Sequence, residues 1–173
     1  MIAGWVIALI TFPGVILHEY GHKKFCDWTK TVVYRVKYFQ FFSQTAGYVV
    51  HAEPVGLKSS FLITIGPLII NTIICLFLPF IGLIIGMDSW FGLLLVWIGL
   101  SAGMNAFPSD TDADNFLQKV KGASEKNTFI FYTANGFSIL VQLANVLKFV
   151  WFDLWYAIVI ALVLPNLITK ILL

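Results

Sequence analysis

The chain has 173 residues, of which 59% are hydrophobic and only 12% are charged, with a mean hydropathy of +0.86. Because soluble domains carry about 25% charged residues, this composition excludes an ordinary soluble protein and predicts a membrane protein. The net charge of +2 is too small to indicate a nucleic-acid partner, and two isolated cysteines give no disulfide framework.

Five apolar stretches, separated by charged connections, predict the membrane spans. A spanning helix needs about 20 mostly apolar residues, and each stretch approaches or exceeds that length once its apolar flanks are included. We therefore expect a single α-helical membrane domain over 1–173, with a multi-pass topology in the lipid bilayer. The predicted spans are residues 2–25, 59–86, 89–107, 128–148 and 151–172.

The first predicted span ends in a metal-binding pattern, "HEYGH", which has the form H-E-x-x-H. Positions i and i+4 share one face of a helix, so His18 and His22 can bind the same ion, and neutral imidazole is a good ligand for zinc. Glu19 is placed to act as a general base toward a water that the metal activates. Ionisable residues at a span are candidates for function.

Residues 31–54 follow, and they contain too many polar side chains for a span. In "TVVYRVKYFQ", β-branched and aromatic residues are interleaved with Arg35 and Lys37. A second short run, "AGYVVHAEP", ends at Pro54, and "FSQTAG" between the two runs offers turn residues. We expect a small β-hairpin at the membrane surface, and an irregular amphipathic loop is the alternative.

The second predicted span contains "TIGPLIIN", with Gly66, Pro67 and Asn71. A Gly-Pro pair bends a helix or lets another backbone approach closely. An asparagine in an apolar span needs a hydrogen-bond partner. Asn71 therefore has two candidate roles: it donates to a substrate carbonyl or developing oxyanion, or it makes an interhelical hydrogen bond.

An acidic cluster, "FPSDTDAD" at residues 107–114, follows the third predicted span. Catalytic zinc usually has three protein ligands, and this cluster is the first candidate for the third one, with Glu53 and His51 behind it. The alternative is that the acids cap the following helix, where they interact favourably with its dipole. We expect one aspartate to bind the metal and the others to cap.

The distribution of lysine and arginine predicts the orientation of the chain. These residues gather after the first and third spans, and basic connections favour the cytoplasmic side. With five spans, this places the N-terminus outside and the C-terminus inside. It also places the histidine pattern and the acidic cluster at the same depth on the cytoplasmic side. The basic residues after these two spans are Lys23, Lys24, Lys30, Arg35, Lys37, Lys58, Lys119, Lys121 and Lys126.

Taken together, these motifs resemble the site-2 protease family of intramembrane zinc metalloproteases. "HEYGH", "AGYVV", "GPLIIN" and "NAFPSDTDA" are similar, in that order, to the elements of the family, and they cover most of 1–113. The third metal-binding motif departs from the family because no Asp-Gly pair is present. The spacing from Pro108 selects Asp110, whereas a small residue after the aspartate selects Asp112, which we favour.

The resemblance implies a compact, B-type member that acts as a zinc metalloendopeptidase in regulated intramembrane proteolysis. Zinc is expected on His18, His22 and one of the two aspartates, with Glu19 as the base. The expected substrate is a membrane-anchored protein cut in or near the bilayer, whose unwound segment an exposed strand at 47–51 could bind by β-addition. The alternative hypothesis is a non-catalytic zinc-binding membrane protein of the same fold.

Overall fold

The structure is a computed structural model that describes residues 4–41, 43, 45–124 and 128–172. It is mostly helical and contains one two-stranded antiparallel sheet, as predicted. Residues 2 and 3 of the first predicted span, and 42 and 44 of the predicted turn, lie outside the described residues. The elements are α1 (Gly4–Ile10), α2 (Phe12–Trp28), β1 (Val33–Lys37), β2 (Tyr48–His51), α3 (Gly56–Ile85), α4 (Trp90–Met104), α5 (Asp110–Lys121), α6 (Phe129–Leu147), the 3₁₀ turn η1 (Lys148–Val150), α7 (Phe152–Ile158), the π-helical turn η2 (Val159–Val163) and α8 (Leu164–Leu172).

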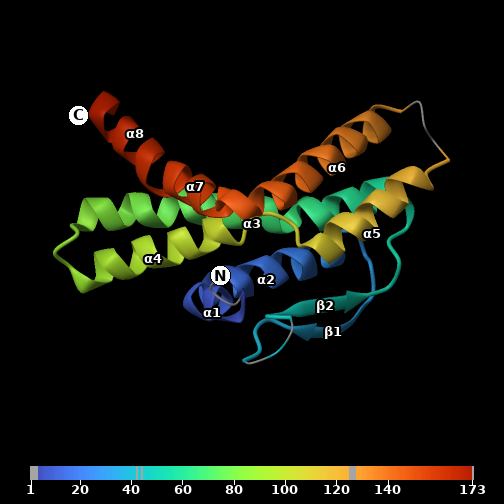
Figure 1. The fold of residues 1–173 in the computed structure, drawn as a ribbon, viewed down its shortest axis with the longest axis horizontal. Coiled ribbons are helices and arrows are strands. Elements are labelled where there is room, and N and C mark those ends of the chain that lie inside the picture. The colour runs from blue at the N-terminus through green and yellow to red at the C-terminus, as the bar shows by residue number, and fades with distance from the viewer. Residues whose placement is uncertain (1–3, 42, 44, 125–127, 173) are drawn as a thin grey trace.

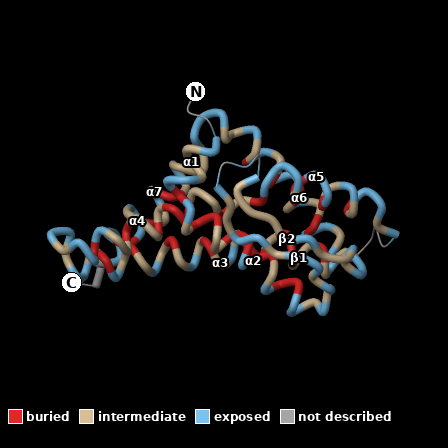
Figure 2. The backbone as a smooth tube through the Cα atoms, turned by 90° about the horizontal axis from the view of Figure 1, so that it is seen from below, coloured by how far each residue is buried: buried red, intermediate tan, exposed pale blue. Residues whose placement is uncertain are grey.

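Helix α3, with 30 residues, forms the axis of the molecule. Figure 1 shows α2 and α5 beside its N-terminal half, while α4 runs back along its C-terminal half from the α3–α4 turn to the middle. In Figure 2 the buried positions gather along α3 and α4 and where α2 meets them. The middle of α3 is therefore the place where residues from α2, α4 and α5 can meet.

The Gly-Pro pair of α3 serves the close approach of α2. The helix continues through Pro67. A Cβ atom added to Gly21 of α2 would lie 2.7 Å from Pro67 Cα, and one added to Gly66 would lie 2.6 Å from the Phe25 ring. Of the two roles expected for the pair, close backbone contact is the one that these distances support, and it fixes α2 against α3.

The first predicted span is broken, because α1 and α2 meet at Thr11 with an angle of 89°. Pro13 lies at the start of α2 and has no backbone N–H to donate. Two side chains of α4 bind carbonyls at the corner: Trp97 Nε1 donates to Ile10 O at 3.1 Å, and Ser101 Oγ donates to Thr11 O at 2.8 Å. The prediction of one continuous helix over 2–25 is therefore wrong.

The last two predicted spans are arranged end to end. Helix α6 packs against α5 and α3, whereas α7 and η2 pack against α4 and α3. Figure 1 shows α6 running from one end of the molecule to its middle, and α7 and α8 continuing to the other end. The break falls at Trp151, which has a left-handed backbone conformation with φ of 59°. This differs from the two separate membrane crossings expected at 128–148 and 151–172.

Among the described residues, two helices are long and apolar enough to cross a membrane, namely α3 and the continuous helix Phe129–Val150. The bent pair α1 and α2 raises the number to three if it counts as one span. Helices α4 and Phe152–Ile168 are apolar but shorter. In the described part of the chain, two or three candidate spans thus stand where five were predicted. Many of their exposed side chains are large and apolar, as a bilayer requires.

The predicted β-hairpin is present. Strands β1 and β2 pair antiparallel, with Val33 opposite His51 and Lys37 opposite Tyr48, and with an irregularity between Val33 and Arg35. Both strands contact α2 (Figure 1). The hairpin therefore lies beside the helix that carries the H-E-x-x-H pattern.

Candidate metal centre

Two backbone carbonyls from outside α2 orient the imidazoles of His18 and His22. Nδ1 of His18 lies 2.8 Å from Asn105 O, and Nδ1 of His22 lies 3.1 Å from Ile63 O. A carbonyl oxygen only accepts hydrogen bonds, so each Nδ1 carries the proton and donates it. Each Nε2 therefore presents a lone pair on the opposite side of its ring. This is how metal-binding histidines are held in proteins.

Asp112 completes a group of three metal-binding side chains. The Nε2 atoms of the two histidines are 3.2 Å apart. Asp112 Oδ2 lies 3.3 Å from His22 Nε2 and 3.7 Å from His18 Nε2. Within the described ranges, this is the one group of three such residues that could hold an ion. Asp110, the alternative ligand, is exposed at the start of α5 and does not belong to the group.

The donor atoms fit a four-coordinate zinc ion. Zinc binds nitrogen and oxygen at about 2.0–2.2 Å in a tetrahedral arrangement, which places neighbouring donors about 3.3–3.6 Å apart. The observed separations of 3.2, 3.3 and 3.7 Å match this spacing. Three lone pairs that converge at such distances repel one another unless a positive charge lies between them. The chemistry of the site thus suits a cation, and its nitrogen-rich ligands suit zinc.

Asp112 also caps the helix that carries it. Ser109 is the N-cap of α5, and its Oγ accepts a hydrogen bond from the Asp112 backbone N–H. Asp112 Oδ2 in turn accepts from the Ser109 N–H at 3.0 Å and from Ser109 Oγ at 2.6 Å. The sequence suggested separate aspartates for binding and capping, whereas here the aspartate of the candidate metal group is also the one that caps α5.

Glu19 lies beside the three residues and is enclosed by the hairpin. Its side chain belongs to α2, is only 9% exposed, and interacts electrostatically with His18 and Asp112. A Cβ atom added to Gly47, just before β2, would lie 2.7 Å from Glu19 Cγ. Because Gly47 has no side chain, the hairpin backbone can pack directly on the carboxylate side chain.

Asn71 is fully buried and links three elements behind His18. Its Nδ2 donates to Gly14 O at 3.2 Å and to Asn105 O at 2.7 Å. Asn105 O is also the acceptor for His18. Both amide hydrogens therefore bind backbone carbonyls, and neither is left for a substrate oxygen in this conformation. Of the two roles that the sequence left open for Asn71, these contacts correspond to the hydrogen bond between helices.

Several residues that build the site were not apparent from the sequence. The carbonyls of Asn105 and Ile63 have no sequence signal, because any residue supplies the same acceptor. Ser101 holds the start of α2 through the Gly14 N–H, which donates to Ser101 Oγ at 2.8 Å. Ser109 is different: serine three residues before an acidic residue is a capping-box pattern, so the sequence could have indicated it.

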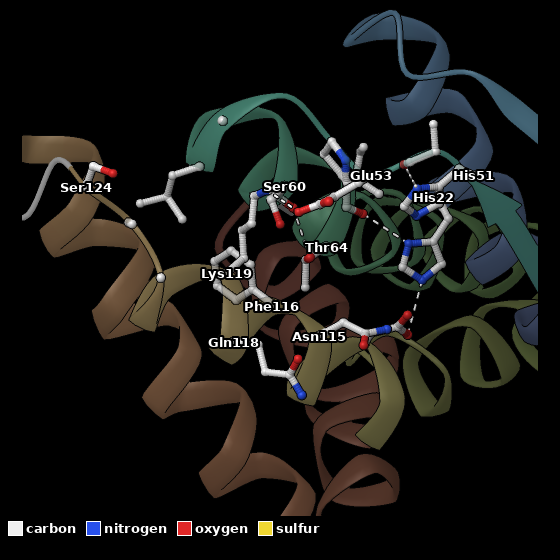
Figure 3. Close-up of a pocket in the computed structure, with 18 residues that line it drawn as sticks. His22, His51, Glu53, Ser60, Thr64, Asn115, Phe116, Gln118, Lys119 and Ser124 are labelled. Atoms are coloured by element: carbon white, nitrogen blue, oxygen red, sulfur yellow. Dashed lines mark hydrogen bonds and ion pairs between the residues drawn. The ribbon is translucent and has the colours of Figure 1, made fainter.

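A cavity of about 890 Å³ opens beside the metal centre. Its walls are the N-terminal part of α3, helix α5 and the connection from β2 to α3, and His22 and Asp112 are among its lining residues. Figure 3 shows Lys119 and Glu53 joined across the cavity, at 2.6 Å between Nζ and Oε1. This hydrogen bond to Lys119 lowers the pKa of the Glu53 carboxyl. The other polar lining residues include His51, Ser60, Thr64, Asn115, Gln118 and Ser124.

Comparisons of the chain with protein-family models, with curated proteins and with solved structures gave no match. What the centre can do therefore follows from its own geometry. Two oriented imidazoles, one carboxylate and a neighbouring buried glutamate meet at the side of a cavity. This set can bind a metal ion and place a proton acceptor next to it.

Proposed function

We propose that this protein is an integral-membrane zinc metalloprotease that hydrolyses peptide bonds of membrane-anchored proteins in or near the bilayer. The observation that carries the proposal is the convergence of His18, His22 and Asp112 from two helices, with both imidazoles oriented through Nδ1. Glu19 adds a carboxylate that is not needed as a ligand. The resemblance to the site-2 protease family and the candidate membrane spans support the same function.

Each side chain of the centre has a role in peptide hydrolysis. His18, His22 and Asp112 would hold the zinc ion, which when bound acts as a Lewis acid and lowers the pKa of water. Glu19 accepts a proton from the attacking water and returns it to the leaving amine nitrogen, as a general base and then a general acid. Asn105 O and Ile63 O keep the imidazole rings from turning.

The substrate would bind as an extended strand. A helical segment shields its carbonyls in its own hydrogen bonds, so it must unwind before it is cut. In the described part of the sheet, β2 pairs with β1 on one edge only. The other edge of β2 has backbone groups for β-addition, and Gly47 at its start already lies against Glu19.

The active site would face the cytoplasm. Lys58 at the start of α3 and Lys119 and Lys121 at the end of α5 lie at the same end of the molecule, and basic residues favour the cytoplasmic side. The cavity is lined by these two segments. Water would then enter from the cytoplasm, while the substrate arrives from the bilayer.

Replacement of Glu19 by glutamine tests this function. The Glu19→Gln protein should bind as much zinc as the wild type but cleave a membrane-anchored reporter roughly 10²- to 10⁴-fold more slowly, which is the usual contribution of a general base. Zinc content and cleavage should both be measured on the purified protein in detergent or vesicles. Asp110→Asn, which alters an exposed acid outside the metal group, is the matched control. Cleavage by Glu19→Gln at the wild-type rate would contradict the proposal.

The second candidate function is a zinc-binding membrane protein without catalytic activity. The close packing of Gly47 on Glu19 favours it, because an enclosed carboxylate has little room to act on water. In that case the wild type binds zinc, and both it and Glu19→Gln leave the reporter uncut. The same pair of measurements therefore separates the two functions.

A further inference from the structure

We infer that His51 is a substrate-binding residue of this centre, which accepts a hydrogen bond from a backbone N–H of an extended peptide. The inference rests on the proposed function and assigns a further residue to it. The chain has three histidines, and His51 is the one outside the metal group. It lines the same cavity as His22 and Asp112.

The alternation of β2 turns His51 toward the metal centre. Successive side chains of a strand point to opposite faces, so positions 47, 49 and 51 share a face. Gly47 presents that face to Glu19. Val50, on the other face, is 47% exposed. The strand thus crosses α2 with Gly47 over the glutamate and with His51 further along, in the cavity with His22 (Figure 3).

The hydrogen bonding of His51 leaves one nitrogen available. Its Nδ1 lies 2.7 Å from Ala52 O, and because a carbonyl only accepts, Nδ1 carries the proton. Nε2 then bears a lone pair, and no described residue donates to it. In the neutral ring this nitrogen can accept a hydrogen bond. An extended peptide presents such donors, its backbone N–H groups, at regular intervals.

The position of His51 distinguishes this role from metal binding and from structural support. The three ligand atoms of the metal group lie within 4.8 Å of one another, and no His51 nitrogen belongs to that group. The bond from Nδ1 goes to the next residue in the chain, so it fixes the ring without joining two elements. What the ring supplies is a fixed acceptor in the cavity, next to the place where a peptide would be cut.

Two hydroxamates test the role of His51, because hydroxamates bind zinc whether or not the protein turns over substrate. A peptide hydroxamate also occupies the cavity, whereas acetohydroxamate reaches the metal alone. Loss of one hydrogen bond should weaken binding of the peptide hydroxamate to His51→Ala roughly 3- to 10-fold, with acetohydroxamate affinity and zinc content unchanged. His51→Gln, whose amide oxygen can replace Nε2 as an acceptor, should recover most of the loss. Val50→Ala, on the opposite face of β2, is the control.

Each result decides the inference. Unchanged binding of the peptide hydroxamate to His51→Ala overturns it. Loss of zinc, or equal weakening of both hydroxamates, also overturns it, because His51 would then act on the metal. A selective loss that glutamine recovers supports it. Failure of the protease function would appear elsewhere, as a wild type that binds both hydroxamates but leaves the reporter intact.

Discussion

At the scale of single residues, the two imidazoles depend on neighbours that lie far from them in the chain. His18 is oriented by the carbonyl of Asn105, which follows α4, and His22 by that of Ile63 in α3. The ligand atoms are thus positioned by three packed helices. A change that moves α4 or α3 will therefore alter metal binding without touching a ligand.

Substitution of the two aspartates distinguishes the third ligand. Asn at position 112 can still accept the capping hydrogen bonds from Ser109, but it no longer carries the charge that zinc requires. We expect Asp112→Asn to weaken zinc binding by roughly 100-fold or more, above the 10- to 100-fold typical of residues that merely support a ligand. Asp110→Asn should bind zinc like the wild type. Zinc retained against a competing chelator is the measurement, and loss of zinc by the Asp110 variant alone would reverse the assignment.

Gly47 offers a test of how closely the hairpin covers the base. A side chain at this position would meet Glu19 Cγ at 2.7 Å, so either Glu19 or the strand must move. Since a displacement of about 1 Å can reduce a rate 10²-fold, we expect Gly47→Val to lose most of its cleavage activity while keeping its zinc. Gly136→Ala in α6 meets nothing within 4 Å and is the control. Normal cleavage by Gly47→Val would show that the contact has no role in activity.

That His18 and His22 lie together was predictable because their spacing is local: positions i and i+4 are neighbours on any helix. The choice between Asp110 and Asp112 was not, because it depends on how the first turn of α5 is rotated toward α2. The same holds for Asn71, whose type predicted a hydrogen bond but whose partners, Gly14 O and Asn105 O, come from other elements. Sequence reasoning is thus strongest where the chain itself fixes the geometry.

At the scale of elements, the corner between α1 and α2 is a tertiary feature. Residues 2–25 read as one apolar helix, and the side chains that hold the corner, Trp97 and Ser101, belong to α4. The hairpin, in contrast, was visible in the alternation of its residues and in its turn composition. The corner fixes where α2 begins and therefore where His18 and His22 lie relative to α3 and α4.

Ser101 is the residue whose loss should loosen this corner. Its hydroxyl donates to Thr11 O and accepts from the Gly14 N–H, and all three residues are buried. Ser101→Ala removes two buried hydrogen bonds, each worth about 0.5–1.5 kcal/mol, although the Gly14 N–H still donates to Thr11 O at 3.0 Å. We expect a lower midpoint of thermal unfolding in detergent, whereas Ser124→Ala, at an exposed position, should unfold like the wild type. Equal midpoints for the two variants would contradict this role of Ser101.

At the scale of the whole molecule, the ends of the helices carry different charges. Lys58 and Lys121 lie at one end, and Asp88 lies at the other, in the turn between α3 and α4 (Figure 1). Helix α8 leads toward the end with Asp88, because α7 and α8 continue away from α6. The prediction from the charges assumed that each of the five apolar stretches crosses the bilayer fully. It therefore placed the C-terminus on the same side as the basic connections.

The sidedness of these ends can be measured with cysteine labels. Cys26 and Cys75 are fully buried, so a membrane-impermeant maleimide should find little background. We expect Lys121→Cys to react from the cytoplasm and Asp88→Cys from outside, with a tag appended to the C-terminus detected on the side of Asp88. Detection of the tag on the same side as position 121 would favour the five-span topology expected from the sequence.

Asp112 Oδ2 belongs both to the metal group and to the cap of α5, so we expect the shape of the cavity to depend on whether a metal ion is bound. The oxygen that faces the imidazoles also closes the first turn of α5, and α5 is one wall of the cavity. Binding of a cation there contributes free energy to the folding of that wall. A chelator should therefore not only abolish peptide cleavage but also increase hydrogen exchange in the first turn of α5. If exchange rises in this way, occupation of the metal site and formation of the substrate-binding wall are a single coupled step.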